Sequence, residues 1–207
     1  MTVMDHLKDG TASLHRAAES HPFQQALARG TLDRQLYIQY LCQLWLVHMK
    51  LEAELRRHES VAGLKSVLTA GQYQEVFLRK DLDFFGVDME AVTELAATSA
   101  LRKRIEAASE RSPITLLGFH YVLWGSKHGG RFLAQSIARS YGLDGKSGCS
   151  YFDPYGAEFH RHWRIFAQAM NAACFSEEEK SCMLKSAVDM FSAVQSIEDE
   201  LLTRGKA

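Results

Sequence analysis

Apolar residues recur at spacings of three and four along most of the chain, which is the period of an amphipathic helix. The clearest stripe lies in a helix that we predict after an N-cap at Asp33 and up to about His58. Its members are Leu41, Leu44, His48, Leu51 and Leu55. Asp9-Gly10 and Asp144-Gly145 are surrounded by helical rather than alternating patterns, so they do not predict hairpins. The pattern predicts an all-α fold.

Capping residues, glycines and prolines divide the rest of the chain into further helices. Gly30 and Gly86 end predicted helices, and Ser176 with Glu179 forms a capping box. The remaining helices are predicted at 5–19, 23–28, two or three within 71–108, 113–141, 155–173 and 176–202, with a loop at 142–153. We find no repeat and no linker, so we expect a single domain over residues 1–207.

Composition and charge narrow the function classes. Lys plus Arg total 24 against 25 for Asp plus Glu, and this balance gives no sign of a nucleic-acid-binding protein. The four cysteines have no CxxC spacing, and no stretch approaches the ~20 apolar residues of a membrane span. The first residues lack the apolar core of a signal peptide, and the last ones lack a membrane anchor. We therefore expect a soluble cytoplasmic protein with free thiols.

Three glycines stand close together inside the strongly apolar 113–141 segment, in the run GSKHGG. Each glycine inside a helix costs about 1 kcal/mol relative to alanine, so the segment is expected to weaken or kink there. Gly125 and Gly129 are four residues apart and share a helix face, against which a large flat group could lie. Close packing between helices, or a simple break between two helices, explains the same residues.

A histidine on the first predicted helix has the neighbours of a metal ligand. Lys8, Thr11 and Glu19 are placed along the same side as His15. A carboxylate four residues along can accept the N–H of a metal-bound imidazole, and a lysine can pair with a ligand carboxylate. The alternative is a surface histidine with an ordinary i,i+4 partner.

Together these segments resemble the haem oxygenase family, in particular its soluble, biliverdin-producing bacterial members. The first helices carry the pattern Leu14, His15, Ala18 and Glu19, and the second match is GFHYVLWGSKHGGRFLAQSIA. Weaker matches are FLRKDLDFFG in the middle and the final helices from MNAACFSEEEK onwards. The resemblance covers nearly the whole chain, and its combined motifs are far more specific than either main motif alone.

The resemblance implies that His15 is the proximal iron ligand and the metal site, and that Glu19 positions it. It implies haem between the first helix and the kinked distal helix. Lys8 matches a basic residue near a propionate, and Phe191 a pocket-lining aromatic. The other residues expected to bind the cofactor are Thr11, Gly125, Gly129 and Gly130. The expected catalytic residues are Gly125, Ser126, Gly129 and His48.

The implied reaction opens haem with O2 to biliverdin, Fe(II) and CO. It requires an external electron donor, such as a ferredoxin or a flavin reductase, because the chain has no flavin or dinucleotide fingerprint. The expected use is iron recovery or supply of bilin to a photoreceptor. A basic and aromatic run, residues 160–164, is a candidate propionate partner or docking face for an acidic redox protein, or a solvated face.

Two positions depart from the family pattern. Ser126 stands where many members have an aspartate that holds a proton-delivering water network, and His48 replaces a tyrosine of that network. We hypothesise that His48, Ser126 and an ordered water rebuild the proton path. The alternative is a core histidine bonded to a backbone carbonyl. His128, within the glycine run, either faces solvent, touches the distal pocket or reaches the iron.

Two other functions remain open at this point. The first is a haem carrier or sensor of the same fold that does not turn haem over, with His128 near the iron as its signature. The second is a relative of the same helical fold without haem, such as a thiamin-salvage or di-iron protein. A di-iron site needs several Glu and His ligands on facing helices. The inward stripes offer only His48 and Glu52.

Overall fold

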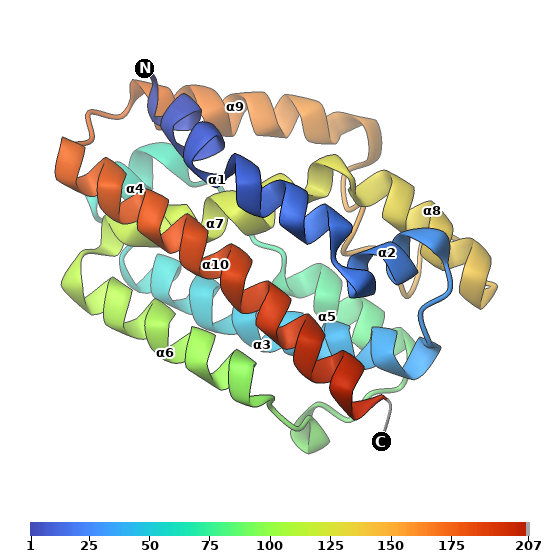
Figure 1. The fold of residues 1–207 in the computed structure, drawn as a ribbon. Coiled ribbons are helices and arrows are strands. Elements are labelled where there is room, and N and C mark those ends of the chain that lie inside the picture. Colours follow the sequence, from blue (N-terminus) through green and yellow to red (C-terminus); the bar gives the residue numbers. More distant parts are fainter. Residues whose placement is uncertain (206–207) are drawn as a thin grey trace.

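The computed structural model describes residues 1–205, which form helices, turns and loops and contain no strand (Figure 1). The predicted all-α fold is confirmed. The helices are α1 Val3–Ser20, α2 Pro22–Arg29, α3 Arg34–Arg57, α4 Ala62–Val67, α5 Glu75–Phe84, α6 Ala96–Arg111, α7 Leu116–Gly125, α8 Gly130–Tyr141, α9 Phe159–Ala172 and α10 Glu177–Arg204. Short 3₁₀ turns lie at η1 Ala70–Gln72, η2 Met89–Ala91, η3 Pro113–Thr115, η4 Ser126–His128 and η5 Gly156–Glu158.

The predicted caps account for several of these boundaries. The Asp33 side chain accepts the backbone N–H groups of Gln35 and Leu36 at the start of α3. Ser176 and Glu179 form the expected capping box of α10. Gly30 ends α2 with a left-handed φ of 71°, a conformation that a side chain disfavours.

The helices differ from the prediction at three places. The single run expected at 113–141 is divided at the glycines, where α7 stops, η4 makes one tight turn and α8 begins. Helix α9 begins at Phe159 rather than near Tyr155, because Gly156 adopts a left-handed φ of 54° that interrupts a helix. The short α4 was not predicted. It has no side-chain cap, and its Gly63 lies against the Ile114 and Phe175 side chains.

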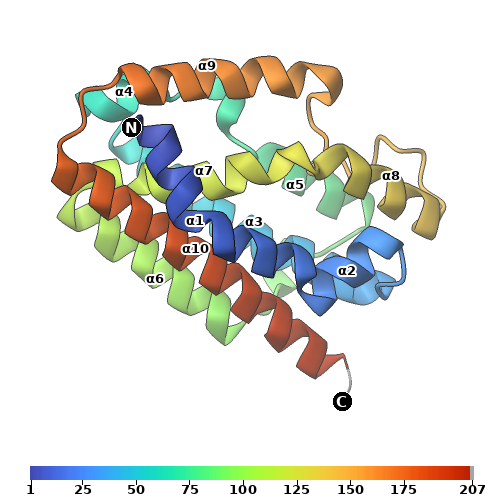
Figure 2. The ribbon, with the colours of Figure 1, turned by 45° about the horizontal axis from the view of Figure 1, so that its top comes forward.

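The helices pack in a way that places α1 and the α7–α8 segment on facing sides of one region. Helix α10 packs against α1, α6 and α7, while α3 packs against α5 and α6. Figure 2 shows α9 running along one side of the α7–α8 line and α1 along the other. Gly118 allows α7 to approach α10 closely, because a Cβ there would collide with the Met183 carbonyl. Among the described residues, no helix has the length and apolar character needed to cross a bilayer.

Candidate functional site

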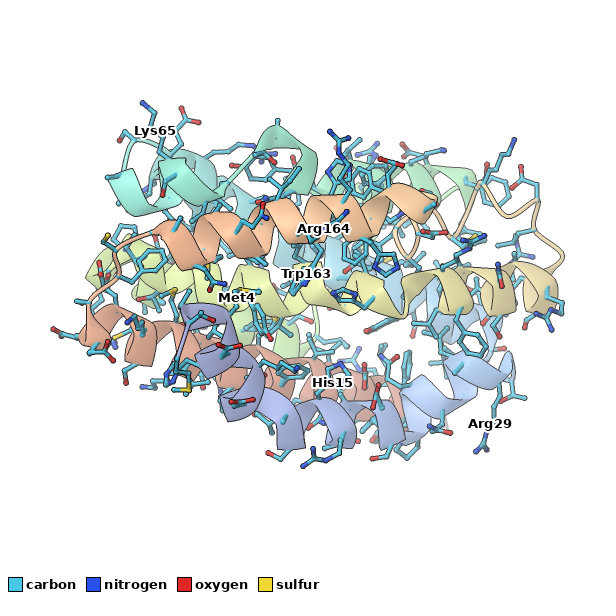
Figure 3. The ribbon with its side chains drawn as sticks, turned by 90° about the horizontal axis from the view of Figure 1, so that it is seen from above. Met4, His15, Arg29, Lys65, Trp163 and Arg164 are labelled. Atoms are coloured by element: carbon cyan, nitrogen blue, oxygen red, sulfur yellow. The ribbon has the colours of Figure 1, made fainter. Side chains whose placement is uncertain are left out.

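His15 presents its imidazole from α1 to the space beside the α7–α8 segment (Figure 3). Its side chain is 61% exposed, and Nδ1 lies 3.6 Å from Oε1 of Glu19. Phe191 of α10 meets the ring edge-on, with centroids 6.1 Å apart. Because Nδ1 faces Glu19, Nε2 is the candidate metal ligand.

The three glycines of the α7–η4–α8 segment have three different surroundings. A Cβ at Gly129 would project into open space, with no atom within 4 Å. A Cβ at Gly125 would lie 3.3 Å from the Trp163 indole of α9, which covers that position. A Cβ at Gly130 would collide with the Phe152 backbone carbonyl. The expected close backbone approach by a flat ligand therefore has room at Gly129, whereas Gly130 is required for packing.

His128 lies on η4 among the aromatic side chains of α9. Its ring meets Trp163 and Phe159 edge-on, with centroids 4.7 and 5.0 Å away. Partial burial lowers the pKa of His128, and the charges of His160 and His15 lower it further. His128 is exposed to solvent.

A buried hydrogen-bond chain begins behind the η4 turn. His48 of α3 is only 2% exposed, and its Nδ1 lies 2.9 Å from Oε1 of Glu52. Its Nε2 lies 2.9 Å from the Tyr151 hydroxyl. Ser126 donates to the Leu123 carbonyl at 2.7 Å. Burial raises the pKa of Tyr151, and the Ser126 hydroxyl opposes a smaller part of that rise. His48 thus bonds to side chains rather than to a backbone carbonyl.

Backbone groups at the start of α5 hold the far end of this chain. Oε1 of Glu52 accepts the N–H of Gln74 at 2.7 Å and that of Glu75 at 3.1 Å. The Arg56 guanidinium lies 3.7 Å from Oε2. With this many donors around it, the Glu52 carboxylate acts as a fixed acceptor.

Lys127 is an unexpected member of the site. It is 4% exposed, and its Nζ sits 2.9 Å from the centroid of the Tyr151 ring. Burial holds the pKa of Lys127 well below its ordinary value. Among the described residues, Nζ has no hydrogen-bond partner. Sequence reasoning missed both Lys127 and Tyr151, because neither stands on a recognisable inward stripe.

Comparison with known proteins decides the family. The family model described as heme oxygenase matches residues 1–199. The chain belongs to the heme oxygenase family.

Individual relatives agree with this assignment. A heme oxygenase of Takifugu rubripes is 30% identical over 205 residues, covering 95% of this chain and 73% of the relative. The structure of heme oxygenase from Leptospira interrogans is 27% identical, with a TM-score of 0.89, and covers 97% of this chain and all of that one. Heme oxygenase-1 of Synechocystis, solved in complex with heme, is 20% identical with a TM-score of 0.90, covering 97% of this chain and 92% of that one. The last comparison shows the shared fold.

The remaining predicted residues of this heme oxygenase family enzyme do not all share one side of α1. Lys8 and Glu19 are exposed, as His15 is. Thr11 is buried, and its hydroxyl donates to the Leu7 carbonyl at 2.7 Å. The helix turns 100° per residue, so positions four and seven apart drift around the axis, and this drift carries Thr11 to the inner face.

The residues around His15 fit a bound haem. A neutral imidazole is a common axial ligand of haem iron, and this one is open to solvent. Gly129 leaves open space on the facing turn, and Phe191 provides an aromatic edge beside the ligand. The site combines one nitrogen donor with apolar and glycine surfaces, as a flat metalloporphyrin requires.

Proposed function

We propose that this protein is a haem oxygenase that binds haem through His15 and opens it to biliverdin, Fe(II) and CO. The observation that carries the proposal is the exposed His15 imidazole, paired with Glu19, opposite a turn in which Gly129 leaves open space. Haem when bound supplies both the substrate macrocycle and the iron that activates dioxygen. The reaction uses O2 and electrons from an external ferredoxin or flavin reductase.

The protein's own groups bind and orient the substrate. Nε2 of His15 binds the iron, and Glu19 accepts the Nδ1 hydrogen and thereby selects the tautomer. Phe191 packs beside the axial imidazole. Gly129 lets the macrocycle lie against backbone, whereas Gly125 makes room for the Trp163 indole and Gly130 allows the turn to pack against the Phe152 backbone. Thr11 contributes from the buried face of α1, where its hydroxyl donates to the Leu7 carbonyl.

Charged side chains at the edge of the site orient the haem and its partners. We propose that Lys8, exposed on α1 two turns before His15, pairs with a propionate. Arg161 and Arg164 are exposed on α9, where they suit an acidic electron donor. Arg161 lies 3.7 Å from Glu158, a loose pair that docking could rearrange.

On the distal side, Ser126 and His48 belong to the proposed proton path. Ser126 holds the water that supplies protons to the reacting oxygen, and His48 supports it from the interior. The support for this proposal is the exposed position of Ser126 on the η4 turn and the buried hydrogen bond of His48 to the Tyr151 hydroxyl, at 2.9 Å.

We place the enzyme in the cytoplasm of a bacterium, where its product serves iron recovery or a bilin-binding photoreceptor. All four cysteines are free thiols, which suits a reducing compartment.

The test is a visible spectrum of the protein mixed with hemin, followed through addition of ascorbate or a ferredoxin–reductase system in air. The proposal predicts a Soret band that disappears while the broad red absorption of biliverdin grows. A Soret band that survives reductant and oxygen means a haem carrier or sensor, and directs attention to His128 as a second ligand. No Soret shift on mixing means that haem is not the ligand.

A further inference from the structure

The joint between α1 and α2 is held from α10 by a buried carboxyl group. The Glu198 side chain is only 1% exposed, and its Oε2 lies 3.0 Å from Nδ1 of His21, the residue between the two helices. We infer that Glu198, in its protonated form, donates to His21 and thereby positions the end of α1 that carries the His15 ligand. The inference deepens the proposed function and rests on it. It makes Glu198 a positioning residue for haem binding.

His21 connects three helices through its backbone and its side chain. Its backbone N–H donates to the Ala18 carbonyl at 3.1 Å, which closes the last turn of α1. Its Nδ1 accepts the Phe23 N–H at 3.3 Å, which caps the first turn of α2. Its Nε2 lies 3.1 Å from Oδ1 of Asp199 on α10. A change in the orientation of this one ring therefore acts on the end of α1 and the start of α2 together.

Helix α2 is also bonded to the residue that is proposed to orient the proximal imidazole. The Gln25 side-chain amide donates to the Glu19 backbone carbonyl at 2.7 Å. One residue earlier, the Gln24 amide donates to Oε1 of Glu198 at 2.5 Å. The Tyr40 hydroxyl of α3 donates to the same oxygen at 3.2 Å. The Glu198 carboxyl group is thus connected to the end of α1 through two adjacent side chains of α2.

The position of the hydrogen between Glu198 and His21 follows from the other contacts of the ring. Because Nδ1 accepts the Phe23 N–H, it carries no hydrogen, and Nε2 is the nitrogen that donates to Asp199. An ionised carboxylate 3.0 Å from Nδ1 would bring two lone pairs together. Oε2 of Glu198 must therefore carry the hydrogen and donate it to His21. The other oxygen, Oε1, remains an acceptor.

The surroundings of Glu198 favour this protonated form. Among the described residues, no lysine or arginine pairs with its carboxyl group, whose charged or ionisable partner is His21. The other titratable groups that face it are Tyr40 of α3 and Asp199 of α10. Burial raises the pKa of Glu198 to about 7. The hydrogen bond to His21 is therefore complete below the ordinary pKa of 4.5 and is lost as pH rises through about 7.

The first test compares the pH dependence of haem affinity in the native protein and in Glu198→Gln. The variant amide donates to His21 and accepts from α2 at every pH, so it mimics the protonated acid. The ratio of the native haem Kd to the variant Kd should rise at least about threefold from pH 6 to pH 8.5. Other groups that titrate on haem binding are common to both proteins and cancel in this ratio. A ratio that stays constant with pH would overturn the inference.

Glu200→Gln is the matched control for a change of charge on the same helix. Glu200 accepts the N–H groups of Ala96 and Ala97 and pairs with Arg204, so its contacts lie away from the α1–α2 joint. Its haem Kd should follow the native pH dependence. A Glu200→Gln profile that matches Glu198→Gln instead would assign the effect to the net charge of α10 and contradict the positioning role.

The native apoprotein supplies a second test that needs neither haem nor a variant. A ¹⁵N NMR spectrum reports which nitrogens of His21 carry a hydrogen, and at pH 6.5 we expect a neutral ring with its hydrogen on Nε2. An imidazolium with hydrogens on both nitrogens would place the proton on His21 rather than Glu198 and overturn the inference. No Soret shift in the native protein would contradict the proposed function itself, while the NMR result would still decide the contact between Glu198 and the joint.

Discussion

His15 and His48 are two histidines of one site in opposite environments. His15 is open to solvent with a single loose partner, Glu19, so its ring is available to a metal. His48 is enclosed, and both of its nitrogens lie 2.9 Å from oxygen partners. Because His15 is exposed, its ring can bind a ligand. Because both nitrogens of His48 already have hydrogen-bond partners, His48 instead fixes the positions of its neighbours.

Replacing His15 should weaken haem binding without changing the stability of the apoprotein. His15→Ala removes an exposed side chain, so the unfolding free energy of the apoprotein should change by less than about 0.5 kcal/mol. The haem Kd should rise at least tenfold, because the axial ligand is lost. A hemin titration at the Soret band, with His6→Ala on the same helix as control, checks this. Equal affinity of the two variants would exclude His15 as the ligand.

Glu198 forms a second buried acid–base contact, away from the proposed haem site. Nδ1 of His21 accepts the Phe23 N–H at 3.3 Å and lies 3.0 Å from Oε2 of Glu198. An accepting nitrogen beside a carboxyl oxygen favours the protonated acid, which can donate to it. Burial, as the main cause, raises the pKa of Glu198 to about 7, and Asp199 adds to the rise, while Gln24, His21 and Tyr40 oppose it.

This raised pKa predicts a pH-dependent stability. The protonated acid is favoured in the folded protein, so its contribution is complete below the ordinary pKa of 4.5 and is lost as pH rises through about 7. Glu198→Gln mimics the protonated form and should be the more stable protein at pH 8, by roughly 3 kcal/mol at most. Thermal unfolding from pH 5 to 8 measures this. A native protein whose stability does not fall over that range would contradict the assignment.

The two hydrogen bonds of His48 differ in how far the sequence could predict them. Glu52 is four residues from His48 on one helix, so their contact follows from helical spacing. Tyr151 is 103 residues away from His48 in a loop, and only the packing of that loop against α3 joins them. His15 and Glu19 were predicted because both lie on one helix and within a motif.

Among the helices, the break between α7 and α8 contains three glycines with different structural roles. The sequence predicted a weakened helix at this place, and the η4 turn confirms it. The surroundings of each glycine depend on segments outside that helix, on Trp163 of α9 for Gly125 and on the Phe152 backbone for Gly130. The spacing of residues within the segment cannot predict that Trp163 or the Phe152 backbone lies against these glycines. The importance of Gly118 at the α7–α10 crossing was missed for the same reason.

Alanine substitutions at Gly129 and Gly130 distinguish a role in haem binding from a role in packing. Gly130→Ala should destabilise the apoprotein by about 1–3 kcal/mol or more, because the Phe152 carbonyl cannot move aside as a flexible side chain can. Gly129→Ala should leave apoprotein stability nearly unchanged but slow haem turnover, because its methyl group enters the open space. Urea denaturation and a turnover assay measure the two effects. Native turnover by Gly129→Ala would show that haem does not approach this turn.

For the molecule as a whole, we propose that haem lies between α1 and the α7–α8 segment. The partners of α1 are mainly α10, with α2 and α9 at its ends. A ligand held from both sides adds a further connection between these parts. The order of the helices and most of their caps were predictable from local patterns. The placement of η4 opposite α1 was not, because it depends on how the other helices pack.

Haem should therefore stabilise the native fold by mass action. At a free haem concentration 100 times the Kd, the expected gain is about 2.7 kcal/mol, seen as a higher Tm. His15→Ala should lose most of the gain under the same conditions. An equal rise in Tm for both proteins would indicate haem binding elsewhere on the surface.

The yield of CO per haem consumed decides whether the protein opens haem enzymatically. Non-specific bleaching by peroxide also removes the Soret band, so the spectrum is best joined to a measurement of products. We expect one CO and one biliverdin for each haem degraded by the native protein with reductant and oxygen, and neither product from His15→Ala. Haem that stays intact in the native protein, or is lost without CO, would contradict it.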